Sequence, residues 1–300
     1  MSSKNGSKSG GSSVVAARPP LFTEVGKQAR DLVYKGFVRG HMLVLSCLGP
    51  IPGSTITTTA TIVDDITVGI ISATLQEGNA KHELTFNTLS NKITASTMVT
   101  NLGVPGLTAG ITTALPCGAN DASAQVCYHH DIAALSAKVI GFKSRPELEF
   151  TANMGMDGAF MGGAIRYDTK SAKIGMSKVG IGYDAKEFSG SFMVDPLIEK
   201  SFDVHVARSL SPRCQVGAHI RHQTEKQLTS AKVAGSYQYD SQTILKGRLD
   251  EKGMVAALLQ YSPSPPFATF SLLAEVNCRD LKQKPNIGLS FTVLGAAVIQ

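Results

Sequence analysis

The chain of 300 residues contains no tryptophan, and charged residues make up only 17% of it, against about 25% in an average soluble domain. Its mean hydropathy of +0.05 is too apolar for a disordered chain. No run of about 18 consecutive apolar residues occurs, which excludes a transmembrane helix. Two classes stay open: a soluble β protein, and a membrane β-barrel, in which only alternate residues face lipid.

The sequence also lacks the patterns of disulfide scaffolds, metal sites and common enzymes. Its five cysteines are widely spread, and no C-x-x-C pair occurs. His129 and His130 are adjacent, so on a strand they would point to opposite faces and could not easily share one metal ion. No phosphate-binding loop, G-x-S-x-G or H-E-x-x-H motif is present, and the acidic residues are isolated. We expect no metal, no cofactor and no enzyme activity.

The positive charge is scattered along the chain. The net charge is +6 and the isoelectric point about 9.0, yet no run of five or more Lys or Arg residues occurs. A nucleic-acid partner is therefore not expected. Cations that line an aqueous pore would give the same total and would attract anions.

The strongest helical pattern lies in residues 20–40. One face, at i, i+3, i+4 and i+7 spacing, carries Phe22, Val25, Ala29, Leu32 and Val33. The other face carries Lys27, Arg30, Asp31 and Lys35. We predict an amphipathic helix over residues 22–36, with Thr23 as its N-cap and Gly36 at its end. Gly36 and Gly40 then form a hinge pair before the next element.

From residue 41 onward the pattern changes to the two-residue period of strands. In residues 287–293 one face carries Ile287, Leu289, Phe291 and Val293, and the other Gly288, Ser290 and Thr292. Turn residues separate about nineteen such segments between residues 41 and 294, roughly 13 residues apart, as expected for strands that cross a bilayer. A soluble sandwich would carry more Glu and Lys on its less apolar faces, whereas small, mildly polar residues suit a wide lumen.

The domain organisation is expected to be simple. Residues 20–300 show no composition break and are predicted to form one barrel domain, with strands from about residue 41 to 294. Residues 1–19 are rich in Ser, Gly and Lys and are predicted to be a disordered tail. A cleaved transit peptide is the alternative interpretation of this tail.

Two motifs resemble those of a known family. Residues 20–36, PLFTEVGKQARDLVYKG, are similar to the N-terminal helix of the mitochondrial voltage-dependent anion channels, closest to the plant branch. Residues 237–259, YQYDSQTILKGRLDEKGMVAALL, resemble the eukaryotic porin signature, with Glu251 as a mild departure. Residues 284–293 are similar to the last strand of the family. The resemblance covers residues 20–294.

The resemblance implies an all-β fold: a transmembrane β-barrel of about 19 strands, with one short N-terminal amphipathic helix inside the pore. This family is itself the known example of that odd number of strands. The family often carries Gly-Leu-Lys before one strand, a motif linked to nucleotide contact. Here the matching residues are Gly106, Leu107 and Thr108, so the resemblance brings no nucleotide contact to this position.

The function that the resemblance implies is a voltage-gated, weakly anion-selective diffusion channel for small metabolites and ions in the mitochondrial outer membrane. Its partners would be the lipid bilayer and the small anions and nucleotide metabolites in transit. Self-association into a homo-oligomer and a location in a plastid envelope both stay open. The alternatives are a protein-import pore of similar barrel fold and a soluble β-rich binding protein.

Alternation along the strands also predicts which cations line the pore. Those on the less apolar faces are Lys138, His219, Arg221, Lys232, Lys246 and Arg248. A register slip of one residue would turn each of them to the outside.

The helix is the candidate gate. Its apolar face, including Phe22, Val25 and Leu32, would hold it to the wall, while Lys27, Arg30, Asp31 and Lys35 would sense the field. Moving one charge through the membrane field is worth about 2.3 kcal/mol per 100 mV. The alternative is a static plug. We expect neutralisation of both Lys27 and Arg30 to flatten the voltage dependence if the helix charges take part in gating.

Overall fold

The protein is described from a computed structural model that covers residues 19–63, 66–116, 118, 121–142, 145–263, 268–280, 282 and 284–295. The predicted N-terminal tail lies outside these residues, except for Pro19. Within them the chain forms a short 3-10 helix, one α-helix and a single sheet of nineteen strands. Neither helix in the described part of the chain is long and apolar enough to cross a membrane.

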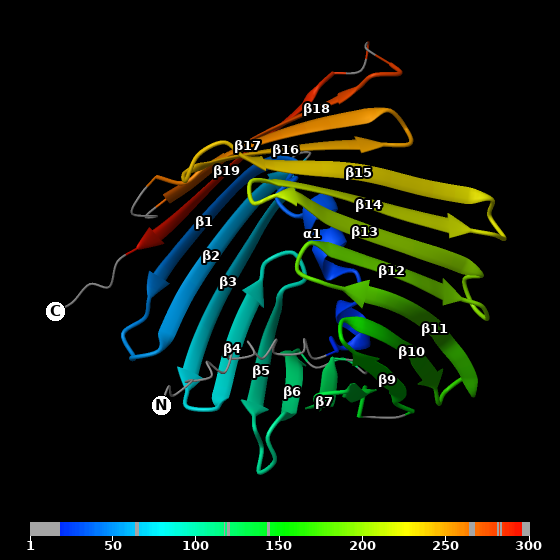
Figure 1. The fold of residues 1–300 in the computed structure, drawn as a ribbon. Helices are drawn as coiled ribbons and strands as arrows, with labels where there is room; N and C mark the ends of the chain where they lie inside the picture. Colours follow the sequence, from blue (N-terminus) through cyan, green and yellow to red (C-terminus); the bar gives the residue numbers. More distant parts are fainter. Residues whose placement is uncertain are drawn as a thin grey trace, which may run out of the picture.

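The strands follow one another around the sheet in chain order (Figure 1). Their bounds are β1 Gly40–Leu48, β2 Ser54–Val63, β3 Ile66–Glu77, β4 Ala80–Asn87, β5 Lys92–Thr100, β6 Leu107–Leu115, β7 Ala122–His129, β8 Ala133–Ile140, β9 Glu147–Met156, β10 Ala159–Asp168, β11 Lys173–Asp184, β12 Phe188–Asp195, β13 Ser201–Ser211, β14 Cys214–Gln223, β15 Leu228–Gln238, β16 Thr243–Asp250, β17 Met254–Tyr261, β18 Ala268–Asn277 and β19 Asn286–Gly295. The predicted number of strands is confirmed.

The sheet closes on itself through its first and last strands. Consecutive strands pair antiparallel, so strands 1 and 19 run in the same direction and must meet in parallel. The register runs from Gly40 opposite Gly288 to Cys47 opposite Gly295. The described strands thus form a closed barrel with no free edge, which satisfies the backbone hydrogen bonds between strands without water.

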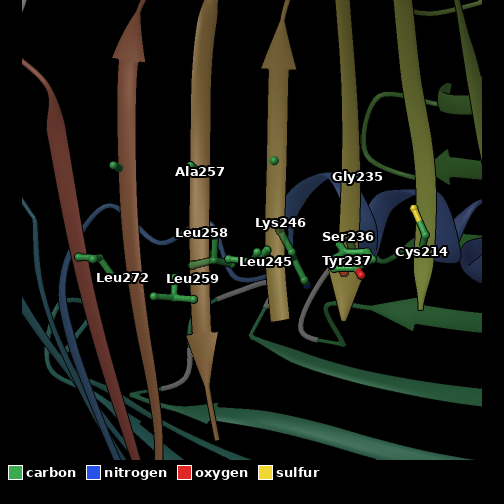
Figure 2. A pocket seen from close by; sticks show the side chains of 12 residues that line it. Cys214, Gly235, Ser236, Tyr237, Leu245, Lys246, Ala257, Leu258, Leu259 and Leu272 are labelled. Atoms are coloured by element: carbon green, nitrogen blue, oxygen red, sulfur yellow. The ribbon is translucent and has the colours of Figure 1, made fainter. Parts of the chain in front are cut away.

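Alternation gives the barrel an apolar outside and a more polar inside. On β16, Leu245 and Leu249 are exposed on the outer face, whereas Lys246 and Arg248 contact the N-terminal segment within the barrel. Figure 2 shows the wall of β14 to β18 around Leu245 and Lys246, with α1 behind it. An apolar groove of about 480 Å³ runs here between side chains such as Tyr237 and Leu259.

The N-terminal helix is broken, contrary to the predicted continuous helix over residues 22–36. A 3-10 helix, η1, spans Phe22–Glu24, and the α-helix α1 spans Lys27–Tyr34. Gly26 separates them because its backbone is left-handed, with φ of +72°. Gly26 is also the N-cap residue of α1, so the prediction of Thr23 as N-cap is wrong. No side chain caps this end of α1 by a hydrogen bond.

Glycines also shape the exit from the helix. Gly36 follows the C-cap residue Lys35 with φ of +96°, the conformation predicted for the end of this helix. Gly40, at the start of β1, has φ of +78° and lies against the Ile62 carbonyl, which leaves no room for a side chain. The two predicted hinge residues therefore both occupy backbone conformations that favour glycine.

Candidate pore and its N-terminal helix

The N-terminal segment lies inside the barrel, where η1 contacts β9 and β10, and α1 contacts β13, β14 and β15 (Figure 1). Phe22 and Val25 are buried against Phe160, Ala164 and Met193 of the wall. The five residues of the predicted apolar face are all buried: Phe22, Val25, Ala29, Leu32 and Val33. The inner wall is thus the surface that covers the apolar face of the helix.

The C-terminal half of α1 has a separate apolar contact. Leu32 and Val33 form a buried cluster with Ala234 of β15. A Cβ atom on Gly217 of β14 would lie only 2.9 Å from Leu32 Cδ2, so the missing side chain makes the space in which Leu32 sits. Small wall residues therefore shape the docking surface of the helix.

Polar bonds fix the N-terminal segment at two further points. Asn153 of β9, which is fully buried, donates from Nδ2 to the Pro20 carbonyl over 2.7 Å. Gln28 Nε2 donates to Asp184 Oδ1 at the end of β11 over 3.0 Å. The segment is therefore held at its start and along α1.

Two of the predicted lining residues meet the last residue of α1. Tyr34 Oη lies 2.7 Å from His219 Nδ1, and the two rings meet edge to face. Lys232 Nζ lies 4.7 Å from the centroid of the Tyr34 ring, in a cation–π contact. His219 and Lys232 are register partners on β14 and β15.

Arg221 follows His219 on the same face of β14, next to acidic side chains. Its guanidinium pairs with Glu199, and its Nε lies 3.8 Å from Asp203 Oδ1. Asp203 also accepts from His219 Nε2 over 3.4 Å if that nitrogen carries a proton. The charge of Arg221 is thus largely balanced where it stands.

Lys246 and Arg248 of β16 reach the end of α1 and the linker that follows it. Lys246 Nζ lies 3.4 Å from the Lys35 carbonyl, and Arg248 Nη1 lies 3.5 Å from the Val33 carbonyl. Because the carbonyl groups at a helix C-terminus are partly negative, cations are favourable there. The Arg248 guanidinium also lies over the Phe37 ring at 4.4 Å.

A buried carboxylate ties this linker to the wall. Glu275 of β18 is 1% exposed and accepts from Arg39 Nε over 2.6 Å and from Arg248 Nη2 over 3.1 Å. We call these three residues the arginine clamp. The clamp joins residue 39, between Gly36 and Gly40, to two strands of the barrel.

Lys138 lies apart from the other predicted lining residues, on β8. It is opposite Glu149 of β9 and shares its face with Ala134, the register partner of Asn153. Because Asn153 bonds to the N-terminal segment, this face is the inner one. The structure therefore brings His219, Arg221, Lys232, Lys246 and Arg248 together beside α1 and leaves Lys138 on another part of the wall.

The charged side of α1 faces the open interior. Lys27 Nζ lies 3.8 Å from Glu24 Oε1, and Arg30 Nη2 donates to the Thr23 carbonyl over 3.0 Å. Both contacts cross the break at Gly26. Asp31 and Lys35 are exposed and line a polar cavity of about 410 Å³ between the helix and the wall. The helix thus presents charge to the pore and apolar side chains to the wall.

The family model described as eukaryotic porin matches residues 18–288 of this chain. The chain belongs to the eukaryotic porin family. Mitochondrial outer membrane protein porin 3 of Arabidopsis thaliana is 26% identical over 275 residues, covering 92% of this chain and 98% of that protein. The outer plastidial membrane protein porin of Pisum sativum is 26% identical over 278 residues, with the same two coverages.

Among solved structures, a mutant of Rh. blastica porin aligns with a TM-score of 0.44 and 6% sequence identity, over 78% of this chain and 89% of its own. This similarity is too low to support an inference. The membership of the eukaryotic porins rests on the sequence match, and members of this family are pore-forming channels. The closed barrel with its apolar outer face agrees with a pore in a membrane.

The inner-face residues that were not predicted include Asp203, His205 and Glu275, which contact His219, Gly26 of the helix and Arg39 of the linker respectively. Each lies on the inner face of a strand whose outer face is apolar, as Phe202, Val204 and Val206 show on β13. That alternation was a usable signal for their orientation. Their partners are at least 14 residues away along the chain, so only the barrel register brings these groups together.

Proposed function

We propose that this porin is a voltage-gated, weakly anion-selective diffusion channel for small metabolites and ions in the mitochondrial outer membrane. The observation that carries the proposal is the charged α1 held inside a closed barrel, with hinge glycines at its C-terminal end. A diffusion channel needs a wide polar passage and no reaction centre.

Weak anion selectivity follows from the balance of inner charges. Several wall cations are paired with carboxylates, as Arg221 is with Glu199 and Arg248 with Glu275. Lys232 and Lys246 instead contact a tyrosine ring and a backbone carbonyl. A modest excess of cationic charge in a wide aqueous pore gives a preference for anions that salt would largely screen.

Voltage gating follows from the charge on the N-terminal segment. Residues 22–37 carry Lys27, Arg30 and Lys35 against Glu24 and Asp31, a net charge of one. A displacement of this segment across part of the field would couple the pore to voltage, at about 2.3 kcal/mol per charge and 100 mV for the full field. The hinge at Gly36 and Gly40 would permit such a movement.

A mitochondrial location is proposed because the relatives include mitochondrial outer membrane porins, such as the one from Triticum aestivum. The plastidial porin of Pisum sativum makes a plastid envelope the competing location. Fractionation of the native organelles with markers for both outer membranes would separate the two.

The channel proposal is tested by reconstitution of the full chain in a planar bilayer. Across a salt gradient we expect a reversal potential of the sign for anions, and closure at high voltage. No conductance, or a clear cation preference of the open state, would contradict it. Release of the protein from membranes by alkaline carbonate would favour a soluble binding protein instead.

A further inference from the structure

Two histidines lie stacked between α1 and the wall. His205 of β13 and His219 of β14 are register partners, their ring centroids are 4.4 Å apart, and their planes differ by 4°. His205 is 2% exposed. Parallel rings at this distance are typical of aromatic stacking. We call the two residues the histidine pair.

Both ends of α1 rest on this pair. A Cβ atom on Gly26, at the N-terminal end of α1, would lie 2.7 Å from His205 Cγ, so the glycine backbone directly covers the His205 ring. At the other end, Tyr34 Oη bonds to His219 Nδ1 over 2.7 Å. The stack therefore stands under the helix as a single support.

The two rings have different surroundings. His219 has a polar partner at each ring nitrogen, since its Nε2 lies 3.4 Å from Asp203 Oδ1 and its Nδ1 lies 2.7 Å from Tyr34 Oη. The polar contact of His205 is the neutral hydroxyl of Ser191, at 3.4 Å from Nδ1.

Charges around His205 come from several elements. Arg30 of α1, His219 of β14 and Lys178 of β11 oppose a positive charge on this ring, and Asp203 on its own strand offsets them. Arg221 draws Asp203 toward itself from the other side. A proton on His205 would thus face the His219 ring at 4.4 Å and the cations Arg30 and Lys178, with Gly26 excluding water.

We propose that the histidine pair is a proton-sensitive latch, which holds α1 against β13 and β14 when His205 is neutral and releases it when His205 becomes charged. The release admits water to the charged ring, which relieves the repulsion. The latch rests on the proposed function only in that a mobile helix would regulate the pore; the docking equilibrium itself can be measured separately.

The direction of the pH effect follows from the linkage between proton binding and helix docking. A histidine in water titrates near pH 6.5, so the released state takes up a proton below that pH, whereas the docked state resists it. Docking is therefore complete above about pH 6.5 and weakens as the pH falls. The ratio of released to docked helix should rise by up to about tenfold per pH unit well below pH 6.5, and by about 16-fold between pH 6.5 and 5.0.

The test measures the position of the helix directly. The native cysteines are first replaced by serine. One spin label is then placed at Thr23, which is exposed and lies far from the hinge, and the other at Ser241, in the turn between β15 and β16. Double electron–electron resonance in phosphatidylcholine vesicles should give one distance at pH 7.5. At pH 5.0 a second, broader population should appear.

Three variants make the measurement specific. His205→Gln cannot take up the proton and should show one distance at both pH values. His219→Gln removes the ring that opposes a positive charge on His205, so the docked state should accept the proton more readily and the response at pH 5.0 should be smaller. His222→Gln is the matched control, because His222 packs on Phe202 on the outer side of β14, and it should respond like the unmodified protein.

Identical distance distributions at both pH values in the unmodified protein would overturn the latch, as would an unchanged response in His205→Gln. Bilayer recordings of the same proteins separate the two proposals. A pH-dependent distance with unaltered voltage dependence would leave the latch intact and remove its role in gating. Voltage gating in a protein whose label distance does not change with pH would contradict the latch and leave the channel proposal intact.

Discussion

Leu32 of α1 sits where Gly217 of β14 lacks a side chain. A Cβ atom on Gly217 would lie 2.9 Å from Leu32 Cδ2 and 3.7 Å from Leu32 Cβ. The second distance lies within the range of about 3.5–4.5 Å between the Cβ atoms of a disulfide. This contact joins α1 to β14 at a position where a disulfide can be introduced.

The first prediction uses that geometry. In a protein without its native cysteines, the double variant Leu32→Cys, Gly217→Cys should form a disulfide that fixes α1 to β14. If the helix moves during gating, the oxidised protein will stay open at voltages that close the unmodified channel. Reduction should restore closure.

The single-cysteine variants are the controls for this lock. Each keeps the helix free and should close with voltage under oxidising and reducing conditions alike. Full voltage-dependent closure of the oxidised double variant, with the disulfide verified by mass spectrometry, would show that gating does not need movement of α1 away from β14.

The second prediction concerns the helix charges. Lys27→Gln with Arg30→Gln should flatten the conductance–voltage curve, because up to two charges no longer move in the field. Lys170→Gln with Lys252→Gln, in turns outside the strands, is the matched control and should leave the slope unchanged. An identical slope in the helix variant would remove these charges from the gating mechanism.

The third prediction concerns selectivity. Lys232→Glu with Lys246→Glu reverses two inner charges. Among the residues that the structure describes, these lysines contact the Tyr34 ring and the Lys35 carbonyl, and not a carboxylate. The reversal potential across a salt gradient should move toward cations, and the shift should shrink at high ionic strength as the charges are screened. Lys170→Glu with Lys252→Glu changes the net charge equally at the rim. Equal shifts in both variants would mean that the inner lysines do not set the selectivity.

The fourth prediction tests the arginine clamp. Glu275→Gln leaves the buried Arg248 guanidinium without its carboxylate, and breaking such a pair costs about 3–5 kcal/mol. We expect a loss at the lower end, because the Arg39 side chain is 55% exposed and can be solvated. Thermal unfolding in detergent, followed by circular dichroism, should show a lower melting temperature.

Glu225→Gln is the control for the clamp. Its hydrogen bond with Lys200, 2.8 Å long, lowers the pKa of the Glu225 carboxyl, but both side chains lie in water in the turn after β14 and near the start of β13. An exposed pair of this kind contributes little to stability. Equal melting temperatures of Glu275→Gln and the unmodified protein would show that the clamp is dispensable for folding.

The approximate number and positions of the strands could be predicted because each strand carries its own signal. On β16 the alternation of Leu245 and Lys246 follows from a pleated strand with lipid on one side and a lumen on the other. The apolar face of residues 22–33 was predictable for the same reason, since it depends only on helical spacing. The break at Gly26 was not, because it depends on the close approach of that residue to His205.

The sequence by itself thus determined a chain of about nineteen amphipathic strands behind one amphipathic segment, through periodicity that each element shows alone. The tertiary structure decided the partners. Glu275 meets Arg39 across 236 residues, and His205 stacks on His219, only because closure of the barrel fixes the register between strands. Register is a property of paired strands, and no single strand contains it.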